Sequence, residues 1–430
     1  MFVSVGFGRA RGGYGLRMRR LVLMIAAVVA VAVVAGGAQA GPTVVYGLQD
    51  DAWIADGPGA VADRVAKLQG LGFGIVRVTV RWDVVEQTRG TFDWTRPDAV
   101  LKSLDEAGID AVVTLYGTPE WANGGRGPNV APVRGADFAR FAGAVAEQYP
   151  SVRRWTIWNE PNQRPWLSTA SPAQYVAKLL NPAYAAIHGV SPSSLVAGGV
   201  TAPRGGKGGL SPVAFIRGMG RVKARLDAYA HHPYALSPSE TPWSGGCAHC
   251  ETISMSTIGR LVNETRKAFG PVRLWLTELG YQSNPPDRRA GVPLTVQASH
   301  IAAAAYLAWA TPRVDLLIQF LYRDEPNLDR WQSGLETVSG RAKPAMGAVV
   351  APLAQMARTG SRTSLWGAIR PGDGARAYRL QRWNGSAWKA VGAVQRTRVD
   401  GIIRREVRAG KGAKLRLLAD GISGNTLVVR

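Results

Sequence analysis

The sequence predicts an α/β protein in which a (β/α)8 barrel is followed by a small antiparallel β-sandwich domain. Two observations carry this prediction. From residue 43 to residue 358, short apolar runs alternate with longer amphipathic runs, which is typical of a parallel sheet covered by helices. After residue 359, single apolar and polar residues alternate, which is typical of antiparallel strands.

The first region divides into eight strands and seven helices. We expect strands at residues 43–48, 74–80, 109–116, 152–160, 194–200, 226–231, 272–278 and 314–322. We expect helices at residues 60–68, 98–107, 135–148, 172–187, 254–269, 294–310 and 345–357. The rival arrangement is an open doubly wound sheet, which usually has a glycine-rich phosphate turn after its first strand. Residues 48–51 read Leu-Gln-Asp-Asp and do not resemble such a turn, so a closed barrel is favoured.

The last region reads as three strands with turns between them. The strands are expected at residues 377–383, 388–394 and 414–418, and the turns at Asn-Gly 384–385 and Asp-Gly 400–401. We therefore assign a signal peptide to residues 1–40, the barrel to residues 41–359, and a basic β-sandwich accessory domain to residues 360–430.

The first 40 residues have the features of a secretory signal peptide. Arg17, Arg19 and Arg20 precede an apolar run at residues 21–34, and Ala-Gln-Ala at residues 38–40 offers a cleavage site. The run is short for a membrane span of about 20 residues, although an uncleaved N-terminal anchor is the alternative. No later segment reads as a span. We expect a secreted or cell-surface (extracellular) protein without a membrane span after signal removal.

The two cysteines, Cys247 and Cys250, are close together in the sequence. In an exported protein this spacing favours a local disulfide that stiffens a loop, and we expect this loop to form one wall of the cleft. A zinc site with His249 is the alternative, but the second half of a ligand set is missing.

The net charge of +22 is concentrated at the C-terminal end. Residues 360–430 contain fifteen Lys and Arg against four Asp and Glu. An anionic partner such as an acidic wall polymer is one explanation, and an arginine-rich solvated face is the other. No motif indicates a nucleic-acid partner.

Two glutamates follow apolar strands in a way that indicates function. Residues 158–162 read Trp-Asn-Glu-Pro-Asn, so that Glu160 ends the fourth expected strand, and Glu278 ends the seventh. One βα unit takes roughly 40 residues, so Glu160 and Glu278 should stand three strands apart and face each other across one barrel mouth. Cleavage of a glycosidic bond needs such a pair: an acid for the leaving oxygen, and a second carboxylate across the anomeric carbon.

Neighbouring polar residues fit the same chemistry. Glu278 must stay ionised to attack, and Arg77 and Tyr234 are candidates to stabilise its charge. Asn159 can bond the sugar hydroxyl next to the reacting carbon. A separation of about 5 Å between the two carboxyl groups would mean retention of configuration.

This pattern resembles the retaining glycoside hydrolases of clan A, which are (β/α)8 TIM-barrel glycosidases with an Asn-Glu pair after strand four and a glutamate after strand seven. The run at residues 158–162 and Thr-Pro-Glu-Trp at residues 118–121 are most similar to families 39 and 5. The resemblance covers residues 43–358. It implies that Glu160 is the acid/base and Glu278 the nucleophile. It also implies four subsite residues: Arg77, Asn159, His232 and Tyr234.

The two adjacent histidines, His231 and His232, face opposite sides of a strand, so only one can reach the site. His232 is chosen because His-Pro-Tyr at residues 232–234 matches the family's His-x-Tyr pattern. At strand eight the clan usually places a tryptophan beneath the sugar. This chain offers Tyr322 instead, and Trp121 is a further candidate for sugar binding. Stacking on sugar and packing in the core remain equally open for three other tryptophans: Trp158, Trp166 and Trp243.

The sequence therefore predicts a secreted retaining glycosidase that hydrolyses O-glycosyl bonds of a polysaccharide or oligosaccharide. No cofactor or metal is implied. Xylosides, glucosides, arabinosides and uronides all fit this machinery. The alternative is a catalytically silent carbohydrate- or cell-wall-binding protein on the same barrel.

Overall fold

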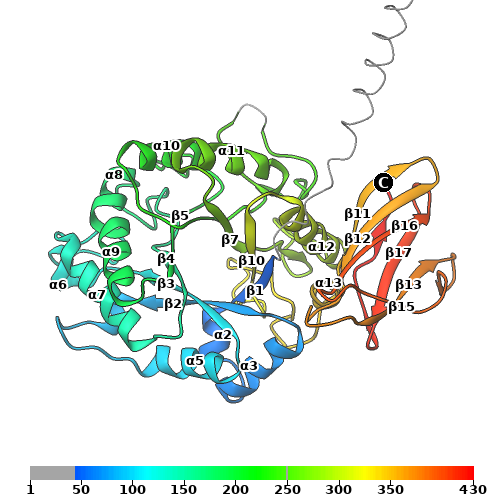
Figure 1. Ribbon diagram of the computed structural model, residues 1–430, viewed down its shortest axis with the longest axis horizontal. Coiled ribbons are helices and arrows are strands. Elements are labelled where there is room, and N and C mark those ends of the chain that lie inside the picture. Colours follow the sequence, from blue (N-terminus) through cyan, green and yellow to red (C-terminus); the bar gives the residue numbers. More distant parts are fainter. Residues whose placement is uncertain (1–43, 248–249) are drawn as a thin grey trace, which may run out of the picture. The chain divides into compact units, whose positions relative to one another are not determined.

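Eight parallel strands close into a barrel, as the sequence predicts (Figure 1). The structure is a computed structural model and describes residues 44–247 and 250–430. The predicted signal peptide and His249 lie outside the described residues. Around the barrel the strand order is β1-β10-β7-β6-β5-β4-β3-β2. The strand bounds are β1 (Val45–Gln49), β2 (Ile75–Arg81), β3 (Asp110–Tyr116), β4 (Arg154–Ile157), β5 (Leu195–Thr201), β6 (Ala228–His231), β7 (Arg273–Leu279) and β10 (Val314–Phe320).

Helices surround the ring of strands in Figure 1. The longer helices are α3 (Val61–Gly70), α5 (Thr95–Glu106), α7 (Gly135–Gln148), α9 (Asn181–Val190), α10 (Pro212–Arg221), α11 (Ile258–Phe269) and α12 (Leu294–Ala310). The shorter segments are α2 (Asp51–Asp56), α4 (Trp82–Val85), α6 (Glu120–Asn123), α8 (Pro172–Tyr175), the π-helical η1 (Val176–Leu180), the 3-10 turn η2 (Met255–Thr257) and α13 (Pro344–Val350). A two-stranded pair, β8 (Ser283–Asn284) and β9 (Val292–Pro293), lies between β7 and α12 in the chain.

The sequence prediction missed helix α10, because its segment is rich in glycine. Ser211 caps this helix by accepting from the N–H of Ala214 at 3.0 Å, and Pro212 follows at the first helical position. Both signals are typical of a helix start. Gly218 is needed because a Cβ there would lie 2.6 Å from the ring of Pro172. Close packing against α8 therefore explains a glycine that weakens the helical pattern.

Small and large side chains share the barrel interior. Ile75, Val112, Ala228 and Trp275 belong to one buried cluster, although they come from different strands. Trp275 is 1% exposed, and alanines on β5 and β6 leave the space that its ring fills. This packed layer lies below the polar residues at the carboxyl ends of the strands, where barrels of this kind place their functional sites.

The chain after the barrel forms antiparallel sheets, as predicted. One sheet has the order β11-β12-β16, and a second is built on β14-β13-β17-β18, with β15 and β19 attached. The bounds are β11 (Leu353–Thr359), β12 (Arg362–Ala368), β13 (Ala377–Trp383), β14 (Trp388–Ala390), β15 (Gln395–Arg396), β16 (Ile402–Arg408), β17 (Lys414–Ala419), β18 (Ile422–Ser423) and β19 (Leu427–Val428).

The expected closing helix at residues 345–357 is too long. Helix α13 ends at Val350, and Leu353 already begins β11, which pairs with β12. Ala351 and Leu353 pack into the core of the β domain, so tertiary packing overrides the apolar run that read as helix.

The β domain packs against helix α12 and the first strand of the barrel. Trp366 of β12 lies 6.0 Å from Trp309 of α12, measured between ring centroids. The guanidinium of Arg370 lies 3.6 Å from the ring centroid of Tyr46. The described residues, 44–247 and 250–430, accordingly form one compact unit. Among the described residues, none of the helices has the length and apolar character needed to cross a bilayer.

Candidate active site

Glu160 lies just beyond β4 in a tightly held turn. Trp158 and Glu160 have left-handed backbones, with φ values of 73° and 40°. Such conformations cost about 1–3 kcal/mol each and persist only where neighbours impose them. Here the N–H of Trp158 donates to the carbonyl of Leu115 at 2.8 Å, and the N–H of Glu160 donates to that of Val200 at 2.9 Å. Strands β3 and β5 therefore fix the direction of the Glu160 side chain.

Glu278 reaches the same mouth because β7 is irregular. Leu276 pairs with Leu317 and Leu279 pairs with Gln319, so β7 carries one extra residue between these two pairs. Trp275 already points into the barrel, and strict alternation would turn Glu278 away from it. The extra residue re-aims the side chain, as β-bulges near active sites commonly do.

Arg77 and Tyr234 hold the Glu278 carboxylate. Arg77 donates from Nη1 to Oε1 of Glu278 at 2.5 Å, and the Tyr234 hydroxyl donates to Oε2 at 3.1 Å. Arg77 is itself fixed, since it donates to Gln49 at 2.5 Å and to Thr114 at 2.8 Å. The Arg77 side chain is 1% exposed, so its charge acts on Glu278 with little screening by solvent.

The surroundings of Glu278 favour its ionised form. Burial raises its pKa, but the charges of His232 and Arg77 and the hydrogen bonds from Arg77 and Tyr234 together outweigh burial, so its pKa is lowered. Conversely, burial and the nearby charge of Glu278 raise the pKa of Tyr234, which therefore keeps its hydroxyl proton as a donor.

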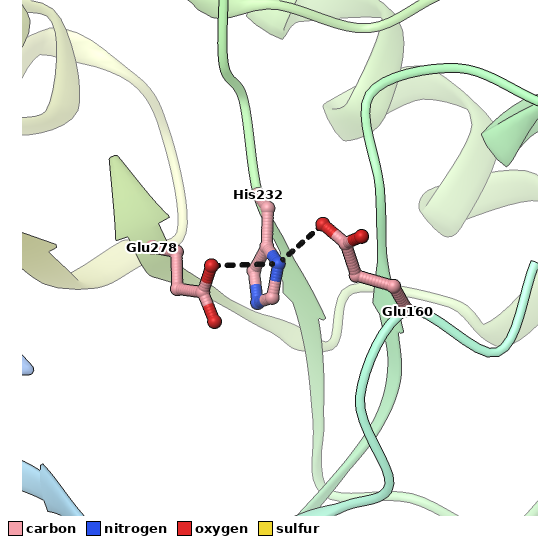
Figure 2. A group of neighbouring side chains, drawn as sticks. All are labelled: Glu160, His232 and Glu278. Atoms are coloured by element: carbon pink, nitrogen blue, oxygen red, sulfur yellow. Dashed lines mark hydrogen bonds and ion pairs between the residues drawn. The ribbon is translucent and has the colours of Figure 1, made fainter. Parts of the chain in front are cut away.

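His232 lies between the two glutamates (Figure 2). Its Nδ1 is 3.0 Å from Oε1 of Glu160 and 3.5 Å from Oε2 of Glu278. Its Nε2 is buried without a hydrogen-bond partner among the described residues. His231 points elsewhere: its Nδ1 lies 2.9 Å from the Thr201 hydroxyl and its Nε2 lies 3.0 Å from the carbonyl of Ile253. The two adjacent histidines therefore face opposite ways, and His232 is the one at the glutamates.

The two carboxylates are close enough for a retaining mechanism. One oxygen of Glu160 and one of Glu278 lie within 4.8 Å of each other. Inverting enzymes separate their carboxyl groups by about 6.5–9.5 Å to admit a water, whereas retaining enzymes hold them about 5–5.5 Å apart. The spacing matches the retaining arrangement.

The same three side chains, Glu160, His232 and Glu278, could each offer one ligand atom to a metal ion. The guanidinium of Arg77 lies directly against Glu278, and this fixed positive charge opposes a second cation beside the same carboxylate. A donor set of two carboxylates and one histidine beside an arginine fits the carboxylate chemistry better than a metal site. The expectation of no metal and no cofactor stays a prediction.

A cavity of about 730 Å³ opens over the glutamates. Glu160, Glu278, Asn159 and Tyr234 all line it. Asn159 accepts from Nη2 of Arg77 at 3.0 Å through Oδ1, which leaves its amide Nδ2 as a donor. His232 and Arg77 lie beneath this lining and contact it through the glutamates. The structure therefore gathers all six of these predicted residues at one mouth.

The structure does not bring Tyr322 and Trp121 to this cavity, which corrects two sequence-based assignments. Tyr322 is 3% exposed, stacks on Trp53 at 3.8 Å between ring centroids, and donates to Glu336 at 3.0 Å. Trp121 donates to the carbonyl of Glu86 at 2.9 Å and packs edge-on against Trp82. Tyr322 and Trp121 therefore pack against neighbouring side chains and do not line the cavity.

Trp331 is the aromatic residue that sequence reasoning missed. It lies in the loop after β10, lines the cavity, and packs at 4.8 Å from Tyr234 and 5.6 Å from Phe320 between ring centroids. In the sequence, its position after strand eight is the one feature that could have indicated a site residue. The loop returns Trp331 to the cavity at the barrel mouth. Trp331 thus stands where Tyr322 was expected.

The remaining tryptophans divide between core and cavity. Trp166 lines the cavity together with Tyr116 and is 37% exposed. Trp158 is fully buried and donates to the carbonyl of Trp166 at 2.8 Å. Trp243 packs against Tyr306 at 5.5 Å. Trp166 and Trp331 are therefore the indoles available to a sugar face.

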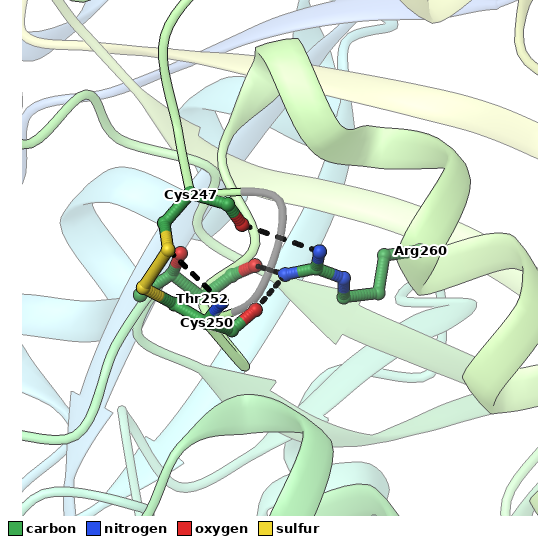
Figure 3. The surroundings of a disulfide bond; sticks show 4 residues. All are labelled: Cys247, Cys250, Thr252 and Arg260. Carbon is green, nitrogen blue, oxygen red and sulfur yellow. Dashed lines mark hydrogen bonds between the residues drawn. A yellow bond between two sulfur atoms is a disulfide. The ribbon is translucent and has the colours of Figure 1, made fainter.

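Cys247 and Cys250 form a disulfide (Figure 3). Arg260 of α11 donates to the carbonyl of Thr252 at 2.7 Å and to that of Cys247 at 3.3 Å, which ties the loop to the helix. Around the disulfide, the described residues 239–247 and 250–254 do not line the cavity that holds the glutamates. It lines a separate pocket of about 260 Å³, which shares only Pro203 and Arg204 with that cavity. The expectation that this loop walls the cleft is wrong in that respect.

The fold is similar to solved structures of glycoside hydrolases. A family 39 glycoside hydrolase from Bacteroides cellulosilyticus WH2 has a TM-score of 0.61 at 17% identity and covers 86% of this chain and 81% of its own. A monomeric β-xylosidase from Caulobacter crescentus CB15 has a TM-score of 0.57 at 17% identity, covering 86% of this chain and 95% of its own. A family 5 enzyme, GH5_18 from Streptomyces cattleya in complex with GlcNAc, has a TM-score of 0.53 at 18% identity, covering 72% and 79%.

No protein-family model and no curated protein sequence matches the chain. At identities this low, the structural likeness establishes the fold. The expected resemblance to the clan A barrels of families 39 and 5 is confirmed at that level. What the site does must be argued from its own residues.

Proposed function

We propose that the protein is a retaining glycoside hydrolase that cleaves O-glycosyl bonds of an oligosaccharide or polysaccharide. The observation that carries this proposal is the pairing of two carboxylates within 4.8 Å, one of them held by Arg77 and Tyr234. The barrel shared with families 39 and 5 supports it. Indoles at the cavity, Trp166 and Trp331, offer the apolar faces on which sugar rings stack.

In the first step, an oxygen of Glu278 attacks the anomeric carbon as the glycosidic C–O bond breaks. Glu160 transfers its proton to the leaving oxygen, so the leaving group departs as an alcohol. Arg77 and Tyr234 keep Glu278 ionised and oriented before attack. Asn159 lines the cavity and is oriented by Arg77 through Oδ1, so its amide Nδ2 is left as a donor for a sugar hydroxyl.

In the second step, the glycosyl–Glu278 ester is hydrolysed. Glu160, now ionised, takes a proton from water as the water oxygen attacks the anomeric carbon and the bond to Glu278 breaks. The His232 contact, 3.0 Å between Nδ1 and Oε1, holds the Glu160 carboxyl group in position for both steps. Two displacements return the original configuration.

We also propose that the protein acts outside the cell. The leader at residues 1–40 and the Cys247–Cys250 disulfide support an oxidising, extracellular setting. Secretion can be checked by expressing the full chain and comparing the mass and N-terminus of the exported protein with cleavage after Ala40. An intact leader on membrane-associated protein would instead support the N-terminal anchor.

The outer face of the β13 sheet could attach the enzyme to an anionic wall polymer. Trp383 and Trp388 lie 5.6 Å apart between ring centroids, and the guanidinium of Arg416 lies 4.4 Å from the Trp388 ring. Exposed Arg379, which has the same strand parity as Trp383, adds positive charge to this face. Retention of the full chain on an acidic polymer should weaken with salt and with Arg416→Gln, whereas salt-independent retention would oppose the idea.

The test of the enzymatic proposal is a screen of the mature protein against aryl glycosides and plant and microbial polysaccharides. Glu160→Gln and Glu278→Gln are assayed in parallel, with circular dichroism to confirm folding. Hydrolysis by the native protein that both variants lose would support the proposal and identify the sugar. No turnover on any substrate, with polysaccharide binding unchanged in both variants, would favour the catalytically silent binding protein.

A further inference from the structure

The cavity above the two glutamates is lined by four arginines: Arg81, Arg96, Arg204 and Arg330. Two of them are neutralised by carboxylates of the protein. Arg81 pairs with Asp83 through two hydrogen bonds, and Arg96 pairs with Asp56 at 2.6 Å on both oxygens. Arg330 is exposed, so water solvates its charge. Arg204 differs from all three.

Arg204 is a half-buried cation without a carboxylate partner. Among the residues that the structure describes, no Asp or Glu oxygen lies within 4.0 Å of its guanidinium. Its Nη2 makes one long hydrogen bond of 3.4 Å to the carbonyl of Tyr234, and its Nε is buried without a partner. Burial lowers its pKa, and the more distant charges of Glu240 and Glu160 oppose this only in part. Withdrawing a cation from water without pairing it is costly, so an arginine in this position indicates a ligand that brings a negative charge.

The backbone places Arg204 on the Glu160 side of the cavity. Its carbonyl accepts from the side-chain amides of Gln163 at 3.1 Å and Asn162 at 3.4 Å, both in the turn that carries Glu160. Glu160 donates its proton to the leaving group in the proposed mechanism. A ligand group bound by Arg204 therefore belongs to the leaving-group side of the cleaved bond.

We propose that Arg204 binds the carboxylate of a uronic acid residue on the leaving-group side, so that the substrate is an acidic glycan. The placement of the uronic acid on the leaving-group side of the cleaved bond rests on the proposed function, whereas the binding of an acidic sugar by Arg204 does not. The planar guanidinium fork matches a carboxylate with two parallel hydrogen bonds, which a lysine cannot reproduce. The cavity lining also includes two carboxylates, Asp51 and Glu325, and two arginines that already pair with carboxylates of the protein. Arg204 is therefore the half-buried positive charge that a sugar carboxylate can neutralise.

The test compares matched oligosaccharides that differ only in the carboxyl group of the uronic acid residue and its carboxyl-reduced, neutral form. The full-length mature protein is assayed with each, alongside Arg204→Met, Arg204→Lys and Arg164→Met. Arg164 is the control, because it is an exposed arginine in the Glu160 turn region that does not line the cavity. The readout is the ratio of kcat/KM for the acidic and neutral substrates, since Arg204 is near Glu160 and its loss can change absolute rates.

We expect the native protein and Arg164→Met to prefer the acidic substrate by about 10- to 100-fold, the range for a hydrogen-bonded charge. Arg204→Met should abolish the preference, and Arg204→Lys should restore part of it. An equal kcat/KM for both substrates in the native protein, or a preference that survives Arg204→Met, would overturn the inference while leaving the glycosidase proposal intact.

If no substrate is hydrolysed, the same four proteins are titrated with both oligosaccharides by calorimetry. Tighter binding of the acidic form that Arg204→Met removes would uphold the site although the catalytic proposal had failed. Equal binding of both forms would overturn it. A sulfated oligosaccharide in a third arm separates a carboxylate site from a general anion site, and stronger binding of the sulfate would contradict the uronic acid.

Discussion

The ends of strands β4 and β7 present the same side chain in unlike surroundings. Glu278 is part of β7 and is held by a buried arginine and a buried tyrosine hydroxyl. Glu160 lies beyond β4 on a left-handed backbone, and His232 is its only side-chain partner among residues 44–247 and 250–430. One carboxylate is bound by a guanidinium and a phenol hydroxyl, and the other is bound by an imidazole.

This difference suits two different tasks. A nucleophile must remain ionised throughout, which a fixed guanidinium ensures. An acid/base must alternate between its two protonation states, and a permanent cation at hydrogen-bond distance would oppose the protonated one. The neighbours of the two glutamates therefore match the roles in the proposed mechanism, and substitutions at each end of the pair should have unequal effects.

The largest effect is expected from Glu278→Ala. Loss of a nucleophile that acts as part of a unit costs on the order of 10⁵-fold or more in kcat. Added azide should attack the anomeric carbon from the vacated side and give a glycosyl azide of inverted configuration, which NMR identifies. Rescue that gives the retained anomer would show that Glu278 is not the nucleophile.

Glu160→Ala should cost less, about 10²- to 10⁴-fold, and the loss should depend on the leaving group. An aryl glycoside with an acidic phenol needs little protonation, so its first step should be almost unaffected. Azide should here give a glycosyl azide of retained configuration. The measurement is kcat/KM across a series of phenols, and a loss independent of phenol acidity would contradict the acid role.

Tyr234→Phe should have a smaller effect, about 10- to 100-fold in kcat/KM, because it removes one hydrogen bond to a charged group. The pKa of Glu278 is lowered below its ordinary 4.5, so activity is present above that folded-state pKa and lost as pH falls through it. Without the Tyr234 hydroxyl the pKa should rise, and the acid limb of the pH–rate profile should move to higher pH. An unmoved limb would mean that Tyr234 does not stabilise the Glu278 charge.

His231→Gln should have the smallest effect on activity and should act on stability instead. Burial lowers the pKa of His231 from 6.5 to about 3, so the folded state binds fewer protons than the unfolded state between these values. Its contribution to stability is present above pH 6.5 and is lost as pH falls toward 3. The free energy of unfolding in urea at pH 4.5 and 7 should therefore differ less in His231→Gln than in the native protein. An equal pH dependence in both would contradict a neutral, structural His231.

The same comparison shows how far the sequence could predict the site. Glu160 and Glu278 follow from strand ends, because parallel strands all end at one mouth. The choice of His232 over His231 follows from the resemblance to the family's His-x-Tyr pattern, since alternation requires only that the two face opposite ways. The orientation of Glu278 depends on an extra residue in β7 that is visible only in the pairing of β7 with β10. Glu278 could be predicted because it ends an apolar strand, although strict alternation would have turned its side chain away from the barrel.

Residues on loops were less accessible to sequence reasoning. Tyr322 follows β10 directly but is turned away by stacking on Trp53, and Trp331 returns to the cavity from farther along the loop. The sequence could not indicate a role for Arg204. We infer that role because no carboxylate of the described residues pairs with Arg204, and this depends on the folded structure. Loop paths and missing partners depend on tertiary structure, whereas strand periodicity is local.

The most direct test of the central claim is to trap the glycosyl-enzyme. A 2-deoxy-2-fluoro glycoside of the sugar identified by the screen, with a good leaving group, slows both steps and slows hydrolysis of the intermediate most. Intact mass and peptide mapping should show one sugar per chain on Glu278, and Glu278→Gln should remain unlabelled. Inactivation with the label on Glu160 or another residue, or turnover without any covalent species, would contradict the roles assigned to the two glutamates.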